Sequence, residues 1–254
     1  MENMSDVIYI TGWDSEAELL RGKNPNLPAG ISKYYYEDFE DLMSKRNLKL
    51  AGTNISVKKE RTILVRNPFV KNTYVNFDEA EILFVHAKAQ YISEILQNLG
   101  AKLFKTKSHD KYEKEDSRNL DASGNIKTEK SGEIKSSVKA NKKNSQDIEW
   151  NFDRTDNFSG NYSAESYAKA IDIAEQSGLI HDIYISGLIA QRNPENANRI
   201  KSHKISIDMT SEFNKTRDVV LGLTCTNLSL SANYSKILKT KHCVERDIEI
   251  EFGE

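Results

Sequence analysis

Residues 77–98 read FDEAEILFVHAKAQYISEILQN, and this stretch carries the strongest single secondary-structure signal in the sequence. Apolar residues recur there every three or four positions, which is typical of a helix with one buried face. Asn76 stands at the N-cap position, Glu79 follows three residues later, and Gly100 can adopt the left-handed conformation that ends many helices. The expected buried face consists of Ile82, Val85, Ala89, Ile92, Leu96 and Leu99.

The chain before this helix has the pattern of a small sheet with one further helix. Short β-branched and aromatic runs predict strands at residues 7–10, 54–57, 62–65 and 71–77. Residues 33–46, KYYYEDFEDLMSKR, place Phe39 and Leu42 on one helical face and acids on the other, which predicts a helix. Residues 1–104 are therefore interpreted as an N-terminal unit with a mixed sheet and two helices.

The C-terminal part, residues 146–254, is predicted to be rich in β-strands. One helix is expected at residues 163–177, where Gly178 can end it. The residues of 247–252, DIEIEF, alternate apolar and polar, which favours an antiparallel sheet with one face in water. Strands are predicted at residues 147–152, 182–189, 204–209, 219–230 and 246–252. The fold class is thus α+β, and the two units could form one continuous domain.

Residues 105–145 form a charged stretch between the two units. They contain eleven Lys or Arg and seven Asp or Glu, but few apolar side chains that could build a core. Apolar residues at even spacings on either side of Ser131 and Gly132 predict a flexible two-stranded hairpin. Residues 108–124 are expected to form a mobile approach to this hairpin.

The same stretch also permits a hypothesis of catalysis. Glu133, Ile134 and Lys135 form an acid-x-Lys triplet, and Asp121 precedes it. In a nuclease of the Asp…Glu-x-Lys type, Asp121 and Glu133 would bind Mg²⁺, and Lys135 would steady the attacking water. Such a site requires acids on a rigid, buried strand. Because only Ile134 and Val138 can anchor this segment, the nuclease is kept as an alternative and no cofactor is expected otherwise.

A compact basic group, formed by Arg199, Lys201 and His203, is the second candidate site. It could grip a phosphate, with Arg199 as the anion-stabilising group and His203 as an acid or base. No metal site is expected, because His181, His242 and the cysteines lack the partners of a closed four-ligand set. The surplus of Lys in residues 105–145 permits nucleic-acid binding, but interleaved acids and a single aromatic residue, Tyr112, argue against it.

Charge and hydropathy predict a cytoplasmic protein. The formal net charge is −2, so no global field favours nucleic acid or an acidic membrane. No window approaches 18 uninterrupted apolar residues, and the first residues carry acids where a signal peptide would need basic ones. Cys225 and Cys243 are the only cysteines, and so few thiols are typical of a protein in a reducing compartment.

The order of elements in residues 131–252 is similar to that of the pore-forming domain of gasdermins. It consists of two polar strands, a helix and then amphipathic strands that end at residues 247–252. The resemblance rests on this order, without a diagnostic motif, and it implies polar ribbons that are remodelled into membrane-spanning hairpins. Transmembrane strands need about 9–11 residues with a continuous apolar face, which residues 124–145 lack, so membrane action is an alternative hypothesis.

Known catalytic signatures, such as phosphate-binding loops and nucleophile elbows, are missing from the sequence. By elimination, the expected function is binding. We expect a non-enzymatic, soluble interaction protein, an accessory or effector component of a microbial system. Its protein partner would contact the charged hairpin or the wet face of the C-terminal sheet.

Overall fold

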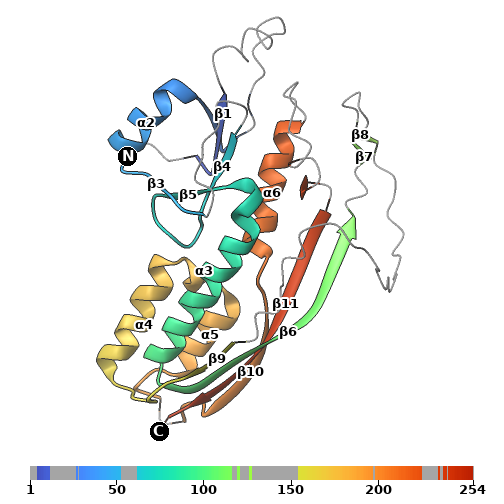
Figure 1. Cartoon of the computed structure of the whole chain (residues 1–254). Coiled ribbons are helices and arrows are strands. Elements are labelled where there is room, and N and C mark those ends of the chain that lie inside the picture. The colour runs from blue at the N-terminus through green and yellow to red at the C-terminus, as the bar shows by residue number, and fades with distance from the viewer. Residues whose placement is uncertain are drawn as a thin grey trace, which may run out of the picture.

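A computed structural model of the chain contains two main β-sheets and five α-helices in the part that it describes. Helix α3 (Phe77–Asn98) contacts strands of both sheets (Figure 1). The predicted α+β class is therefore confirmed. The described residues are 5–11, 27, 29–52, 62–115, 119–120, 126–127, 154–196, 198–224, 234, 237–238 and 240–253.

Sheet A is the predicted mixed sheet of the N-terminal unit, with its strands in the order β2, β1, β4, β5, β3. The inner pairs, β1 with β4 and β4 with β5, are antiparallel, whereas each outer strand runs parallel to its neighbour. The strands are β1 (Val7–Thr11), β2 (Ile31–Tyr35), β3 (Lys49–Leu50), β4 (Thr62–Arg66) and β5 (Thr73–Asn76). The strand predicted at residues 54–57 lies outside the described residues.

Both faces of sheet A are buried, because alternate side chains of a strand point to opposite sides. Val7 and Tyr9 join the core around α3. Ile8 and Ile10 face the other way and belong to a second apolar cluster with Phe39 of helix α2 (Tyr36–Lys45). This two-sided burial explains why β1 is an unbroken apolar run in the sequence.

Sheet B is antiparallel throughout, with its strands in the order β10, β11, β6, β9. Alternate residues of β11 from Val244 to Phe252 are buried, and those between them are at least partly exposed. Helices α3, α4 and α5 lie together on one side of this sheet (Figure 1). The wet face predicted from the alternation is confirmed. The strands are β6 (Ala101–Glu115), β9 (Arg154–Asn157), β10 (Ser202–Asp208) and β11 (Thr240–Phe252).

Strand β6 extends far into the charged stretch. Residues 108–115, which were expected to belong to a mobile approach to the hairpin, pair with β11 as far as Thr240. The expectation failed because the partner strand is more than a hundred residues away in the sequence. Two short strands, β7 (Asn119–Leu120) and β8 (Ile126–Lys127), pair with each other, and the predicted turn at residues 131–132 lies outside the described residues.

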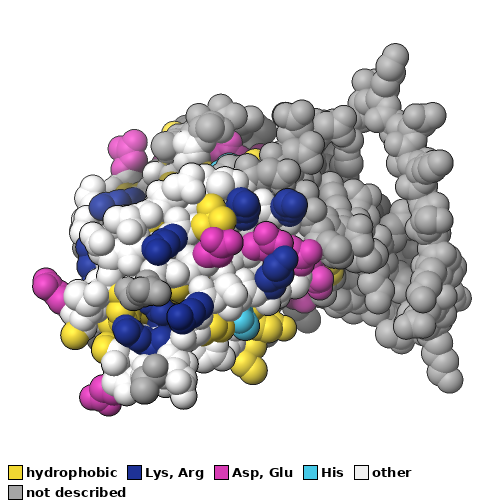
Figure 2. Space-filling model, turned by 90° about the horizontal axis from the view of Figure 1, so that it is seen from below, with side chains coloured by type: hydrophobic (Ala, Val, Ile, Leu, Met, Phe, Trp, Pro, Cys, Tyr) yellow, Lys and Arg dark blue, Asp and Glu magenta, His cyan; other side chains and the backbone are white. Residues whose placement is uncertain are grey.

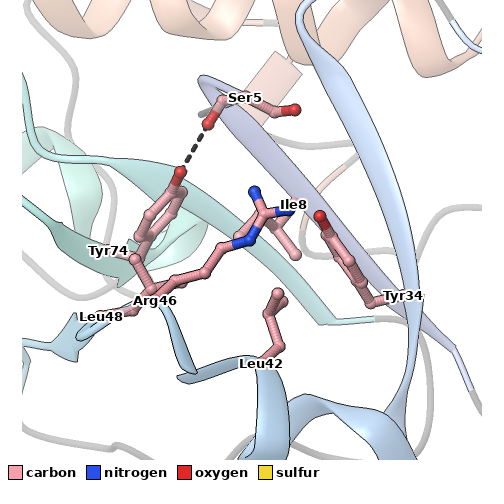
Figure 3. A pocket seen from close by; sticks show the side chains of 7 residues that line it. All are labelled: Ser5, Ile8, Tyr34, Leu42, Arg46, Leu48 and Tyr74. Atoms are coloured by element: carbon pink, nitrogen blue, oxygen red, sulfur yellow. Dashed lines mark hydrogen bonds between the residues drawn. The ribbon is translucent and has the colours of Figure 1, made fainter. Parts of the chain in front are cut away.

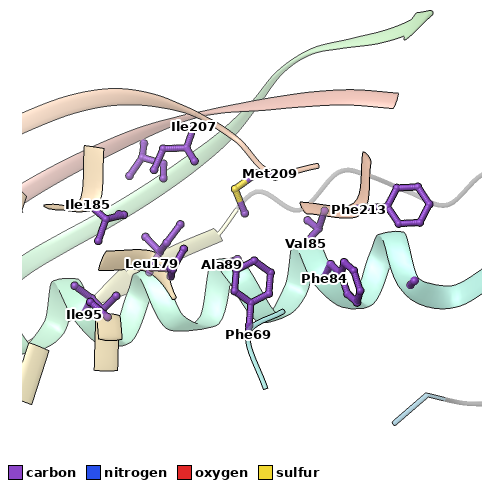
Figure 4. Close-up of a cluster of buried hydrophobic side chains, with 14 of the residues drawn as sticks. Phe69, Phe84, Val85, Ala89, Ile95, Leu179, Ile185, Ile207, Met209 and Phe213 are labelled. Atoms are coloured by element: carbon purple, nitrogen blue, oxygen red, sulfur yellow. The ribbon is translucent and has the colours of Figure 1, made fainter. Parts of the chain in front are cut away.

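More of the surface of helix α3 is buried than the single apolar face that the sequence predicted. The prediction of residues 77–98 is confirmed, and Gly100 follows with the expected positive φ of 81°. Figure 4 shows side chains from the helix, among them Phe84, Val85 and Ala89, in contact with a cluster that continues to Met209 and Phe213. Ile82, expected in the buried face, is only partly buried.

Three helices follow in the second half of the chain, where the sequence predicted one. Helix α4 (Ala164–Gln176) confirms the prediction of residues 163–177, and Ser163 caps it by accepting a hydrogen bond from the Ser166 amide at 3.0 Å. Residues 182–189, predicted as a strand, form helix α5 (Ile183–Gln191) instead. Residues 219–224, also predicted as strand, end helix α6 (Ser211–Thr224).

Local signals explain these two errors. A short apolar run is ambiguous between a strand and a buried helix. The decisive residue in the first case is Asp182, whose carboxylate accepts hydrogen bonds from the amides of Tyr184 and Ile185 and so caps α5. In α6 the buried Phe213, Val220 and Leu223 lie at helical spacing.

Two further boundaries differ from the prediction. Residues 33–35 belong to β2, which pairs with β1 from Ile31 to Tyr35, and α2 begins only at Tyr36. Residues 154–157, for which the sequence predicted no strand, form β9 because pairing with β6 satisfies their backbone groups despite their polar side chains. Residues 147–152, predicted as a strand, lie outside the described residues. No helix in the described ranges has both the length and the apolar character needed to cross a membrane.

Candidate functional site

Asp121, Glu133 and Lys135 all lie outside the described residues, so their convergence stays a prediction. Within the described ranges, no group of three or more His, Cys, Asp or Glu side chains could hold a metal ion. Cys243 is a free thiol.

The structure places the second candidate group at one end of sheet B. Arg199 and Lys201 belong to the connection between α5 and β10, and His203 is the second residue of β10. Lys201 is exposed, whereas Arg199 and His203 are half-buried. The amide of Phe252 donates to the Lys201 carbonyl at 2.8 Å, so the connection is tied to the end of β11. The three residues therefore lie close in the chain, but the side chain that Arg199 contacts belongs to a different segment.

Arg199 meets two residues that the sequence analysis did not single out, Arg192 and Tyr162. The Tyr162 ring centroid lies 5.0 Å from the guanidinium carbon of Arg199 and 4.6 Å from that of Arg192. The Arg192 guanidinium also lies over the ring of Phe252, again at 4.6 Å. These geometries are favourable cation–π contacts. We call Tyr162, Arg192, Arg199 and Lys201 the basic cluster.

Arg192 is almost fully buried, with 2% of its surface exposed. Its Nε donates to the Leu99 carbonyl at 3.1 Å, and its Nη1 donates to the Ile200 carbonyl at 2.9 Å. The Tyr162 hydroxyl donates in turn to the Arg192 carbonyl. The end of α3, the end of α5 and the connection before β10 are thus joined through one guanidinium group.

The basic cluster carries positive charge without a matching acid. Among the described residues, no carboxylate lies within salt-bridge distance of Arg192 or Arg199, and Nη2 of Arg192 is buried without a hydrogen-bond acceptor. Burial lowers the pKa of the Arg192 guanidinium, and the nearby charge of Arg199 lowers it further. Burial also raises the pKa of Tyr162, although the two guanidinium groups act against this effect.

Figure 2 looks at the molecule from the end where the C-terminus lies, and several Lys and Arg side chains gather on this face. Sequence reasoning missed Arg192 because residues 182–189 were read as a strand. An arginine directly after a helix end, seven residues before another arginine, would have been the available signal.

The wet face of sheet B is the second surface of interest. Every second residue of β11 from Glu245 to Glu251 is acidic, which gives a row of four carboxylates along one strand. Lys204 of β10 and Lys105 of β6 both stand opposite Glu249. The Lys204 ammonium lies 2.6 Å from the Glu249 carboxylate, and this hydrogen bond lowers the pKa of Glu249 and raises that of Lys204.

A buried polar cluster surrounds Lys88 of α3, which is 1% exposed. Its Nζ donates to the Asp208 carbonyl at 2.7 Å and to a Glu212 carboxylate oxygen at 3.1 Å, and it lies 3.9 Å from Asp182. Asp182 caps α5, and Glu212 lies in the first turn of α6. We interpret Lys88 as a structural clamp between three helices, because its ammonium protons are engaged within the protein.

A small hollow between α2 and sheet A is lined by side chains that include Tyr34, Arg46 and Tyr74. Figure 3 shows the Arg46 side chain reaching between the rings of Tyr34 and Tyr74. Tyr74 donates to the Ser5 carbonyl at 2.6 Å, and burial raises the pKa of its hydroxyl. The empty space is about 210 Å³ and includes part that is open to solvent, so the enclosed hollow is smaller still.

Comparisons with protein families, with curated proteins and with solved structures found no match.

Proposed function

We propose that the protein is a non-enzymatic binding protein whose protein partner docks on the wet face of sheet B. The observation that carries this proposal is the row of four acids on β11, which is flanked by Lys204 of β10 on one side and by Lys105 and Lys107 of β6 on the other. Opposite charges arranged in fixed rows favour a partner with the complementary pattern and disfavour others. The proposal includes the expected role in the cytosol, as an accessory or effector component of a microbial system.

Two properties of this surface support docking. Its side chains stand on hydrogen-bonded strands, so little backbone order has to be gained when a partner binds. The lysines and acids are at least partly exposed: side-chain exposure is 79% for Lys204 and 40% for Glu249. An exposed pair of this kind adds little to folding stability, so its side chains can be exchanged without loss of the fold.

The test exchanges the charges of one ion pair. In the double variant Lys204→Glu with Glu249→Lys, the pair can still form, but its polarity towards a partner is reversed. Tagged protein would be used to capture partners from extract of the native cells at about 0.15 M salt, where a Debye length is about 8 Å. We expect the wild type to retain a defined protein that the double variant loses, with mass spectrometry as the readout.

The matched control is the exchange Asp41→Lys with Lys45→Glu on α2. This pair is also exposed and also has a separation of 2.6 Å, but it lies outside sheet B. We expect the control to retain the same partner as the wild type. Loss of the partner in the control as well, or retention in the sheet B variant, would contradict docking on this face.

A further inference from the structure

We propose that the basic cluster binds a phosphate group, with Arg199 and Lys201 contacting its oxygens and Arg192 holding the site positive from within. The cluster lies at the end of sheet B, and the proposal does not depend on the partner surface of the preceding section. The ligand class is a phosphate monoester or free phosphate.

The first argument is electrostatic. Arg192 and Arg199 both lie over one aromatic ring, and the described residues offer neither of them a carboxylate. The connection from Arg192 to Lys201 contains three basic residues and a single acid, Glu195. The like charges around this ring repel each other, and a bound anion would offset that repulsion. The fold keeps them together because Arg192 is fixed by two carbonyl groups and two rings.

The second argument concerns access and geometry. Arg199 is half-buried and Lys201 is exposed, so an ion can reach both from solvent. Contact with the Tyr162 ring restrains the guanidinium of Arg199, and a restrained arginine loses less conformational entropy when it binds an oxyanion in bidentate fashion. The exposed Lys102 adds a further positive charge at this end, since its side chain runs over Gly160, two residues before Tyr162.

The third argument decides between an oxyanion and a planar ligand. Sites for bases present an aromatic face for stacking. Here two guanidinium groups already lie over the Tyr162 ring, and its hydroxyl donates to the Arg192 carbonyl. The ring is thus engaged within the protein, and N–H groups are what the site offers. Several positive charges favour a dianionic phosphate over a singly charged carboxylate.

The experiment is a titration of the ¹⁵N-labelled full chain with inorganic phosphate at pH 7.5, at ionic strength held constant with chloride. Saturable shifts of the amide signals of Tyr162, Arg199 and Lys201 are expected, and acetate should bind about tenfold more weakly. Arg199→Gln should weaken phosphate binding about tenfold, which is the typical effect of losing a charged hydrogen-bond donor. Lys201→Gln, an exposed change that leaves the core untouched, should weaken it about threefold.

Lys215→Gln is the control, because Lys215 is an exposed lysine on α6, away from the basic cluster. It should bind phosphate like the wild type. Adenosine monophosphate and methyl phosphate distinguish a plain phosphate site from one that reads an organic group, and we expect equal affinity for both. Unchanged binding in both Arg199→Gln and Lys201→Gln, or binding of the nucleotide at least about tenfold tighter than methyl phosphate, would overturn the proposal.

Discussion

At the residue scale, Gly100 decides whether the basic cluster can form at all. Its φ of 81° lies in the left-handed region that favours glycine. A Cβ atom at this position would lie 2.8 Å from Cβ of Tyr162 and 3.2 Å from Nη2 of Arg192. The sequence predicted the turn at Gly100 from its place after the helix, but the two side chains that require its missing Cβ come from distant segments.

Two glycine-to-alanine variants separate the free-energy cost of a left-handed backbone from the cost of steric overlap with neighbouring side chains. Gly178 also has a positive φ, 74°, but a Cβ there would meet nothing within 4 Å. We expect Gly178→Ala to lower the free energy of unfolding by about 1 kcal/mol, the cost of the left-handed conformation. Gly100→Ala should lower it by about 3 kcal/mol, because overlap with Tyr162 is added. Urea unfolding measures both values, and equal losses would show that packing at Gly100 is unimportant.

At the scale of elements, α3 is connected to the starts of α5 and α6 through Lys88. The ammonium group neutralises acids that lie at two helix N-termini, and it satisfies the carbonyl of Asp208 at the end of β10. The sequence does not reveal this role, because Lys88 lies at the edge of the predicted apolar face, between the turns of Val85 and Ile92, where a lysine usually extends its ammonium group into water. Only the packing of two further helices, one of which was read as a strand, makes the position internal.

Removal of the Lys88 ammonium should therefore cost far more than the loss of a surface charge. We expect Lys88→Ala to lower the free energy of unfolding by about 3 kcal/mol, since it leaves Glu212 and Asp182 without their cation in a poorly hydrated place. Lys88→Met, which keeps most of the volume, should cost less than Lys88→Ala. Lys45→Ala on the surface of α2 should change the value far less, because an exposed ion pair adds little to folding stability. A loss below about 1 kcal/mol for Lys88→Ala would argue against the clamp.

At the scale of the whole molecule, both sheets contribute to one continuous core. The cluster around α3 contains Val7 and Ile63 of sheet A together with Ile207 and Ile248 of sheet B. A shared core makes it costly for one sheet to unfold while the other stays intact. The boundaries predicted at residues 104 and 146 follow changes in amino-acid composition along the sequence. As boundaries between independently folding units, they stay predictions.

We expect the protein to unfold in urea as one cooperative unit. Far-UV circular dichroism should give a single transition, and native-state hydrogen exchange should give similar maximal protection for Ile8 of β1 and Ile248 of β11. The shared core is the physical reason, because opening either sheet exposes apolar surface of α3. Two separate transitions, or protection that differs by several kcal/mol between the strands, would show two independent units.

The sequence alone determined the features that depend on local periodicity and on turn chemistry. Examples are the helix over residues 77–98, the helix ended by Gly178, the buried run of β1 and the one-sided alternation of β11. In each case the pattern of apolar residues is long enough, or its ends are marked clearly enough by turn residues, to distinguish the period of a helix from that of a strand. The α+β class follows from the same signals.

Tertiary structure alone decided which elements meet. Pairing with β11 made residues 108–115 a strand, and burial of Ile185 and Leu188 in the core around α3 resolved an apolar run that was ambiguous in the sequence. The same holds for the candidate site, since Arg199 was visible in the sequence but Tyr162 and Arg192 were not. Contacts between residues far apart in the chain can override local preferences, and a single sequence does not show which distant residues will be neighbours.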